Sequence, residues 1–297
     1  MRNFGYIYLV ITLAVGQVSA QQQFAFSFGE TPQILNLNPG AETNYNYHYG
    51  IPVLSNFNLN AGLTGFDLSE LFVIDGIDFN TKFDRVLNQI NQNDHVNVNL
   101  RVDILNGGYR YDDRTYLSFG FYQETDAVFY MPKDLTDLVY EGTLTNTNRA
   151  FSFSHLRFKA DILGVWHAGI SRKINPQLNI GARVKIYSSS FNAESNHNSG
   201  TLTTSQNSTN LIRQSLNNFN TQVRTSGMIN SDDEFLSNPR DLYSKTFLSG
   251  NLGLGFDFGI TYHVSPQIEF TTSILDFGFV RHAKNTRVFS GEGDFVF

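Results

Sequence analysis

Apolar residues recur at every second position over unusually long stretches of this chain of 297 residues. In the longest stretch, from Leu156 to Ile170, the even-numbered positions carry apolar residues or Gly, while Arg157, Lys159, Asp161, His167 and Ser171 lie on the other face. Shorter stretches at 96–104 and 252–260 repeat the pattern. Side chains of a β-strand point alternately to its two faces, so a period of two predicts strands with one apolar and one polar face. Strands of globular proteins usually have only about five or six residues. The chain is therefore constrained to broad sheets built from long, two-faced strands.

Two matching segments predict how neighbouring strands are joined. Gly169 to Ile180 reads GISRKINPQLNI, and Gly259 to Phe270 reads GITYHVSPQIEF. Each predicts a strand, a tight turn and a second strand, with the proline in the turn, where it needs no ladder hydrogen bond. Together with a turn at 112–114, these short connections alternate with long ones at about 131–155 and 188–246. All the short turns would lie at one end of the sheet, as in outer-membrane barrels.

The alternating segments predict about eight strands, an even number as such barrels require. They lie near residues 45–61, 96–111, 115–130, 156–173, 178–188, 247–262, 268–280 and 285–297. Helical spacing of apolar residues predicts short helices from Phe83 to Ile90, after Pro132, and from Leu211 to Phe219. The predicted fold class is all-β, an antiparallel transmembrane β-barrel with short helices in its outer loops. Phe297 is either the terminal aromatic residue of a closed barrel or a cut within a larger one.

The first 44 residues predict export and a segment that precedes the barrel. Arg2 comes before an apolar run, and small residues ending at Ala20 supply a cleavage site, so residues 1–20 are predicted to be a signal peptide. Residues 21–44, which contain Asn38-Pro39-Gly40, are expected to form a plug or flap. The domain prediction continues with an outer-membrane barrel over 45–297 that carries a long polar loop at 188–246. The predicted location is the outer membrane.

Composition excludes several classes of function. There is no cysteine, so disulfides and thiolate metal sites are excluded. A formal net charge of -6 gives no electrostatic basis for binding nucleic acid. The seven histidines are scattered, and no HExxH, GxSxG or P-loop motif occurs. We therefore expect a protein that is not an enzyme and that needs no cofactor or metal.

Charges of both signs fall on the polar face of the predicted strands. If the strands close into a barrel, these candidate lumen residues are Arg101, Asp103, Arg157, Lys159, Asp161, Arg183, Lys185, Asp257 and Glu269. They would either line a binding or transport path or form ion pairs that fill a narrow barrel. The second interpretation is favoured, because the signs are mixed.

An alternating strand is also compatible with a soluble fold. The alternative to a membrane barrel is an exported β-sandwich that serves as a binding or adhesion module, in which the apolar faces of two sheets pack together. The predicted signal peptide and the length of the strands favour the barrel, since about 9–11 tilted residues cross the hydrocarbon layer.

Several short motifs, taken in order, resemble those of a known family. They are Asn38-Pro39, YGIPVL at 49–54, VNLRVDIL at 98–105, MPKDL at 131–135 with Glu141-Gly142, GISR at 169–172, IGARVK at 180–185 and ILDFG at 274–278. This series resembles an uncharacterised outer-membrane barrel family of Bacteroidota, a domain of unknown function that is distantly similar to fatty-acid-transporter-type barrels and type IX secretion barrels. The resemblance implies outer-membrane lipid as a partner and no active-site residues. The expected role is passage of hydrophobic or small solutes, or docking of a protein partner through outer loops during secretion or surface-protein assembly.

Overall fold

The structure is a computed structural model, and it describes residues 31–52, 54–65, 67, 69–144, 147–206, 212–227, 240, 244–248, 250–265 and 267–297. The predicted signal peptide at 1–20, residues 21–30 of the predicted plug, Leu211 and Pro266 lie outside the described residues.

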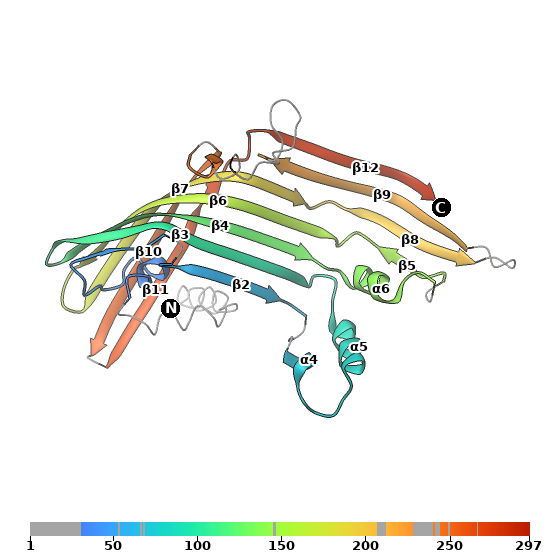
Figure 1. Cartoon of the computed structure of the whole chain (residues 1–297), viewed down its shortest axis with the longest axis horizontal. Coiled ribbons are helices and arrows are strands. Elements are labelled where there is room, and N and C mark those ends of the chain that lie inside the picture. The colour runs from blue at the N-terminus through green and yellow to red at the C-terminus, as the bar shows by residue number, and fades with distance from the viewer. Residues whose placement is uncertain are drawn as a thin grey trace, which may run out of the picture.

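The described residues form one antiparallel sheet of 12 strands (Figure 1). The strands are β1 (Tyr47–Tyr49), β2 (Phe57–Leu63), β3 (His95–Asp112), β4 (Thr115–Tyr130), β5 (Ala150–Ser152), β6 (Arg157–Lys173), β7 (Leu178–Ser195), β8 (Ser199–Gln206), β9 (Ile212–Ser226), β10 (Asn251–Ser265), β11 (Ile268–Val280) and β12 (Thr286–Val296). The helices are α3 (Ile34–Leu37), α4 (Ser69–Phe72), α5 (Phe79–Gln89) and α6 (Lys133–Glu141). Among the described residues, no helix is long and apolar enough to cross a bilayer.

Five pairs of strands lie end to end, so that the 12 strands make seven rows. In sheet order the rows are β1 with β2, β3, β4, β5 with β6, β7 with β8, β10 with β9, and β11 with β12. The chain runs up one row and down the next, so the sheet is a meander. It curls into a half-barrel, and its first and last rows make no pairing with each other within the described residues. The prediction of an all-β, antiparallel, barrel-like fold is confirmed.

A single line of irregularities crosses the sheet. Strand pairing connects Phe57, Val102, Gln123, Gly164, Ser188 and Leu252 in that order, one residue from each of the first six rows. Beside this line, the segment 50–56 separates β1 from β2, extra residues interrupt the pairing of β3 and β7, and residues 227–250 and 281–285 separate the last two pairs of strands. We call it the transverse line. It divides the sheet into a turn-side half, which ends in the short turns, and a far half.

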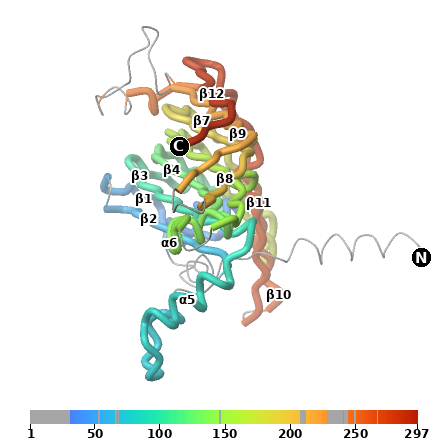
Figure 2. The backbone as a smooth tube through the Cα atoms, turned by 90° about the vertical axis from the view of Figure 1, so that its right-hand side faces the viewer, coloured from blue at the N-terminus to red at the C-terminus, as the bar shows by residue number. Residues whose placement is uncertain are grey.

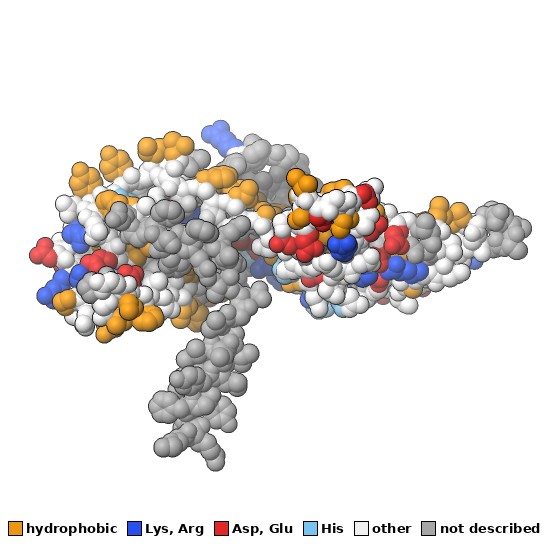
Figure 3. All heavy atoms as spheres, turned by 90° about the horizontal axis from the view of Figure 1, so that it is seen from below, with side chains coloured by type: hydrophobic (Ala, Val, Ile, Leu, Met, Phe, Trp, Pro, Cys, Tyr) orange, Lys and Arg blue, Asp and Glu red, His pale blue; other side chains and the backbone are white. Residues whose placement is uncertain are grey.

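The two faces of the turn-side half differ in polarity. Its convex face exposes alternate apolar side chains of four neighbouring strands: Ile170, Ile180, Val184, Ile186, Leu252, Leu254, Phe256, Phe258, Ile260, Phe270, Ile274, Phe277 and Phe279. Figure 3 shows hydrophobic side chains along the outer margin of this part of the molecule, at left. Its concave face carries polar residues that are buried, Asp257, Arg183, Lys185, Asn179 and Thr261 among them. This is the two-faced strand that the alternation predicted.

Two sequence predictions about the far half are wrong. The segment 188–246 was predicted to be a polar loop with a helix at 211–219, but residues up to Ser195 continue β7, and β8 and β9 are strands. Paired neighbours on both sides of β9 satisfy its backbone, so its polar residues do not exclude it from the sheet. Residues 285–297 were predicted to be a separate eighth strand of the barrel. Instead β12 continues the row of β11, because Asn251 Oδ1 accepts hydrogen bonds from the backbone of Ala283 and Lys284 and holds the bend between them.

The helical predictions at 83–90 and after Pro132 are confirmed. α5 buries Val86, and Asp78 caps its start by accepting hydrogen bonds from the backbone of Asn80 and Thr81. α4 and α5 form an arm that leaves the far end of the sheet between β2 and β3, at lower left in Figure 2.

Candidate functional site

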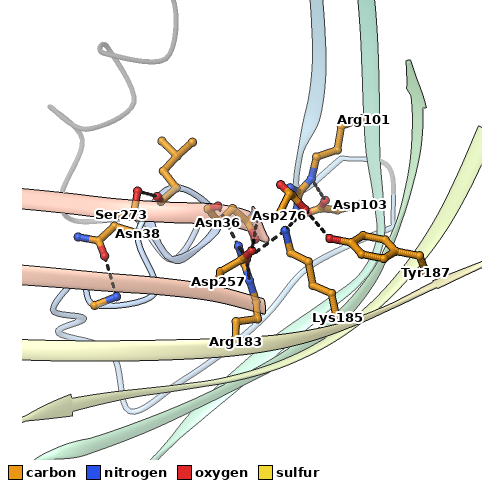
Figure 4. Close-up of polar contacts among 12 residues, drawn as sticks. Asn36, Asn38, Arg101, Asp103, Arg183, Lys185, Tyr187, Asp257, Ser273 and Asp276 are labelled. Atoms are coloured by element: carbon orange, nitrogen blue, oxygen red, sulfur yellow. Dashed lines mark hydrogen bonds and ion pairs between the residues drawn. The ribbon is translucent and has the colours of Figure 1, made fainter. Parts of the chain in front are cut away.

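A network of charges occupies the concave face of the turn-side half (Figure 4), in which Arg183, Lys185 and Asp257 are buried and a fourth member, Asp276, is exposed at the edge. Strand pairing places Asp257 of β10 directly opposite Arg183 of β7. Arg183 Nε donates a hydrogen bond of 2.6 Å to Asp257, and Lys185 Nζ lies 3.0 Å from the same carboxylate oxygen. Lys185 also donates to Asp276 over 2.6 Å, and the hydroxyl of Tyr187 donates to that carboxylate over 2.8 Å. Two cations and two anions therefore balance within one hydrogen-bonded group.

A bulge in β11 brings Asp276 into this network. Between the pairs Phe256–Phe277 and Phe258–Ile274, Asp257 faces two residues of β11 instead of one. Asp276 has a φ of 56°, a left-handed conformation that Asp tolerates better than most residues. Its backbone N–H donates to Asp257 over 2.7 Å, which fixes the bulge. Because one extra residue reverses the alternation, Asp276 points inward while Phe277 points outward.

Residues 31–44, which we call the strap, lie on this concave face and contribute the last partners of the network. Arg183 donates to the side-chain and backbone oxygens of Asn36, over 3.1 and 3.0 Å. Further along the strap, Ser273 donates to the carbonyl of Leu37 and Asn179 donates to that of Gly40. The described part of the predicted plug thus covers polar side chains of β6, β7, β10 and β11.

Two glycines of the sheet allow the strap to approach the strands closely. A Cβ on Gly181 would lie 1.9 Å from the carbonyl oxygen of Pro39, and one on Gly259 would lie 1.9 Å from Oδ1 of Asn38. The amide nitrogen of Asn38 lies within hydrogen-bonding distance of the hydroxyls of Thr261 and Thr271. The backbone of Asn38-Pro39-Gly40 therefore rests directly on the backbone of β7 and β10.

An open hollow of about 660 Å³ adjoins the network at the transverse line. Four carboxylates face it: Glu124, Asp126, Asp161 and Asp276. Lys159 and His282 are its basic side chains, and Leu163, Phe279 and Val280 contribute apolar surface. Burial lowers the pKa of His282, and the carboxylate of Asp161 offsets only part of that effect. His282 is therefore neutral at pH 7.

The nine predicted lumen residues do not form one cluster. Arg183, Lys185 and Asp257 share the network, and Arg101 pairs with Asp103 over 3.2 Å. Lys159 pairs with Asp161 over 3.4 Å beside the hollow. Arg157 lies over the ring of Tyr130 near the far end, and Glu269 lies 3.4 Å from His263 near the short turns.

Sequence reasoning missed several members of the site. Glu124 and Asp126 continue the inward positions of β4, and Tyr187 continues those of β7, but none of them was singled out. A signal for Asp276 existed, because the apolar positions of β11 shift from even numbers up to Ile274 to odd numbers from Phe277 onward. No comparable signal placed Asn36 and Asn38 against the sheet, since their contacts depend on tertiary structure.

The charged network and the hollow differ in what they offer to a ligand. Among the described residues, no group of three or more His, Asp or Glu side chains is arranged to hold a metal ion. The charged side chains of the network are already engaged with one another. The hollow, by contrast, has polar and apolar walls that are open to a solute.

Residues 39–297 match the model of a family described as Family of unknown function (DUF5723). The chain belongs to this family. The match extends over the sheet, the network and part of the strap, so these features lie within the family's domain. No curated protein and no solved structure matches the chain significantly.

Proposed function

We propose that the chain forms the wall of an outer-membrane β-barrel and is not an enzyme. In this proposal the turn-side half crosses the bilayer, its convex face contacts lipid, and its concave face encloses a polar interior. The observation that carries the proposal is the contrast between the two faces of β10, on which Phe256 and Phe258 are exposed while Asp257 between them is 0% exposed. Transfer of such a side chain from water to an apolar environment is worth about 1.5–3 kcal/mol.

The dimensions and aromatic residues of the convex face support this placement. β10 has 15 residues, more than the roughly 9–11 that a tilted strand needs to cross the hydrocarbon layer. Phe121 and Trp166 pack together at the transverse line, where Phe247 stacks on Phe121 with ring centroids 4.7 Å apart. Tyr111 and Tyr262 are exposed toward the short turns. Aromatic residues therefore lie at both edges of the apolar band, as in the girdles of membrane barrels.

The alternative, a soluble β-sandwich, would need a second sheet against the apolar face. The described strands belong to one sheet, and their convex apolar side chains are exposed. This observation favours the membrane barrel over the sandwich.

The interior supports a role in holding or passing a solute. The strap fills the concave face on the turn side, and the hollow of about 660 Å³ opens next to it at the transverse line. We favour this role over one in which the interior is merely filled, because the hollow combines apolar walls with carboxylates. Its solute class would be small molecules with both apolar and polar parts. Relationship to fatty-acid-transporter-type or type IX secretion barrels, and origin in Bacteroidota, remain expectations from the resemblance.

Fluorescence quenching by brominated lipids tests the membrane placement. The natural chain has no cysteine, so Phe256→Cys gives a single site for a fluorophore. We expect strong quenching at position 256 after reconstitution into vesicles. The matched control is Ser205→Cys in β8, an exposed site of the far half, where we expect no quenching. Equal quenching at both sites, or recovery of the unmodified chain in a soluble fraction without detergent, would contradict the proposal.

A further inference from the structure

The arm formed by α4 and α5 ends in an exposed apolar loop. Residues 72–79, which we call the arm tip, include Phe72, Val73, Ile74, Ile77 and Phe79. Ile74 is 102% exposed, Phe72 is 74% exposed and Phe79 is 53% exposed. Figure 1 shows the arm projecting downward from the ends of β2 and β3, and hydrophobic and acidic side chains lie together where it points toward the viewer in Figure 3. Contiguous exposed apolar residues of this kind mark interaction sites.

These exposed apolar residues are distinct from the residues that form the buried side of the arm. The arm has a separate buried side, on which Leu71, Val86 and Ile90 are covered. Phe79, at the end of the arm tip, stacks on Phe83 of α5, whereas Phe72 and Ile74 are 74% and 102% exposed. Surface that adds nothing to the packing of the arm is available for a partner.

Polar contacts hold the arm tip in one shape. Asp78 caps α5, and Asp75 accepts a hydrogen bond from the backbone of Ile77 over 3.1 Å. Lys82, which is nearly buried, lies 2.6 Å from Asp75 and also donates to the carbonyl of Val73. A loop that is already ordered loses less conformational freedom when it binds.

The charge around the arm tip identifies the kind of surface that fits it. Residues 67–89 contain five acidic and two basic side chains, a net charge of -3. Lys82 is buried and paired with Asp75, and Arg85 is exposed. We propose that the arm tip docks into an apolar recess on another protein and that basic residues line the rim of that recess. Electrostatic complementarity of this type favours encounter and fixes orientation.

Lipid is a poorer partner for the arm tip. Segments that anchor to membrane surfaces carry Lys and Arg beside their apolar residues, whereas the neighbours of this loop are acidic. The arm also starts beyond β2, whose seven residues place it roughly 20 Å from the transverse line. This second argument rests on the proposed function, since it takes the transverse line as the edge of the bilayer.

Cysteine labelling in cells that make the protein tests the proposal. Ile74→Cys in the full chain gives a single thiol at a site whose side chain contacts nothing that the fold needs. We expect a water-soluble maleimide to label position 74 at least about tenfold more slowly in cells than in the purified protein, which corresponds to about 1.4 kcal/mol of protection. Gln89→Cys on the same helix is the control, and we expect similar labelling rates in both settings.

Two further measurements separate the possible occupants. If a basic rim contributes to docking, the slow maleimide labelling of position 74 should also be seen in isolated membranes and should be lost in 1 M salt, where charges are screened beyond about 3 Å. Protection that persists in salt would contradict the basic rim. Slow labelling of position 74 in vesicles that contain only the chain, phosphatidylethanolamine and phosphatidylglycerol would identify lipid as the partner of the arm tip. Labelling of the purified chain in detergent that slows as the protein concentration rises would identify a second copy of the chain as the partner. Either result, or equal labelling everywhere, would overturn the proposal, and lipid quenching at position 256 reports on the membrane placement independently.

Discussion

At the scale of single residues, Asp257 holds the polar network together. It is fully buried and pairs with both Arg183 and Lys185. We predict that Asp257→Ala lowers the free energy of unfolding by about 3–5 kcal/mol, because it leaves buried Arg183 without its anionic partner and leaves buried Lys185 with Asp276 alone. Urea unfolding of the full chain in detergent measures this loss. Glu269→Ala, at a half-exposed site near the short turns, is the control and should cost less than about 1 kcal/mol. Similar losses in the two variants would show that the network is not coupled.

Gly259 determines whether the strap can dock. A methyl group at this position would meet Asn38 Oδ1 at 1.9 Å and the backbone of Gly40 at 2.7 Å. We predict that Gly259→Ala displaces the strap while the sheet persists. Amide hydrogen exchange of residues 36–43 should then become at least about tenfold faster, equivalent to about 1.4 kcal/mol of lost protection. Gly291→Ala is the control, since its Cβ would lie 3.4 Å from the nearest atom. Unchanged exchange in Gly259→Ala would contradict the docked strap.

Residue-level prediction from sequence succeeded where side-chain alternation carried the information. The inward positions of Arg183, Lys185 and Asp257 follow from the period of two, and these residues meet in the network. Asp276 was missed because a bulge adds one residue and reverses the alternation, which a count from the preceding strand does not anticipate. The partners contributed by the strap depend on contacts between residues more than 100 positions apart, such as Arg183 with Asn36.

At the scale of elements, the start of α5 depends on an ionised cap. The hydroxyl of Thr81 and the backbone of Asn80 and Thr81 donate to Asp78 and lower its pKa below the ordinary value. The folded state therefore binds a proton less readily than the unfolded state. The contribution of this cap is complete above the ordinary carboxyl pKa and is lost as the pH falls through the lower pKa of the folded state.

We therefore predict that α5 frays at acid pH. Hydrogen exchange of residues 79–84, corrected for the intrinsic pH dependence of exchange, should show protection that declines as Asp78 becomes protonated. Asp78→Asn is the matched control, because Asn also caps helices but does not titrate, and its protection should vary less over the same pH range. An identical decline in both proteins would place the acid-sensitive group elsewhere.

The helices and strands also show which elements a sequence predicts well. α5 has apolar residues at helical spacing and a capping residue at its start, so two independent signals agree. β8 and β9 have neither, because Ser, Thr, Asn and Gln occupy both faces of these strands. Pairing with neighbouring strands keeps them in the sheet, and such pairing leaves no periodic pattern when both faces are polar.

At the scale of the whole molecule, the transverse line joins observations that are far apart in the sequence. The interruptions in the separate rows align with one another across the sheet. A continuous sheet can change environment at such a line, since bulges and short connections redirect the strands without breaking the ladder on both sides. Under the proposed function, the long rows comprise a membrane part and an extramembrane part built on the same strands.

This division makes a prediction about the placement of charge. Phe258 in the turn-side half and Phe289 in β12 are nearly equally exposed, at 50% and 47%. If lipid contacts the turn-side half alone, Phe258→Arg should destabilise the chain in a bilayer by about 2–4 kcal/mol, the cost of Arg near the midplane of a barrel. Phe289→Arg places the same charge in water and should change stability by less than about 0.5 kcal/mol. Unfolding of both variants from lipid vesicles gives the comparison. Equal costs at the two positions would show that the transverse line is not the edge of the bilayer, because exposure alone would then explain the effect.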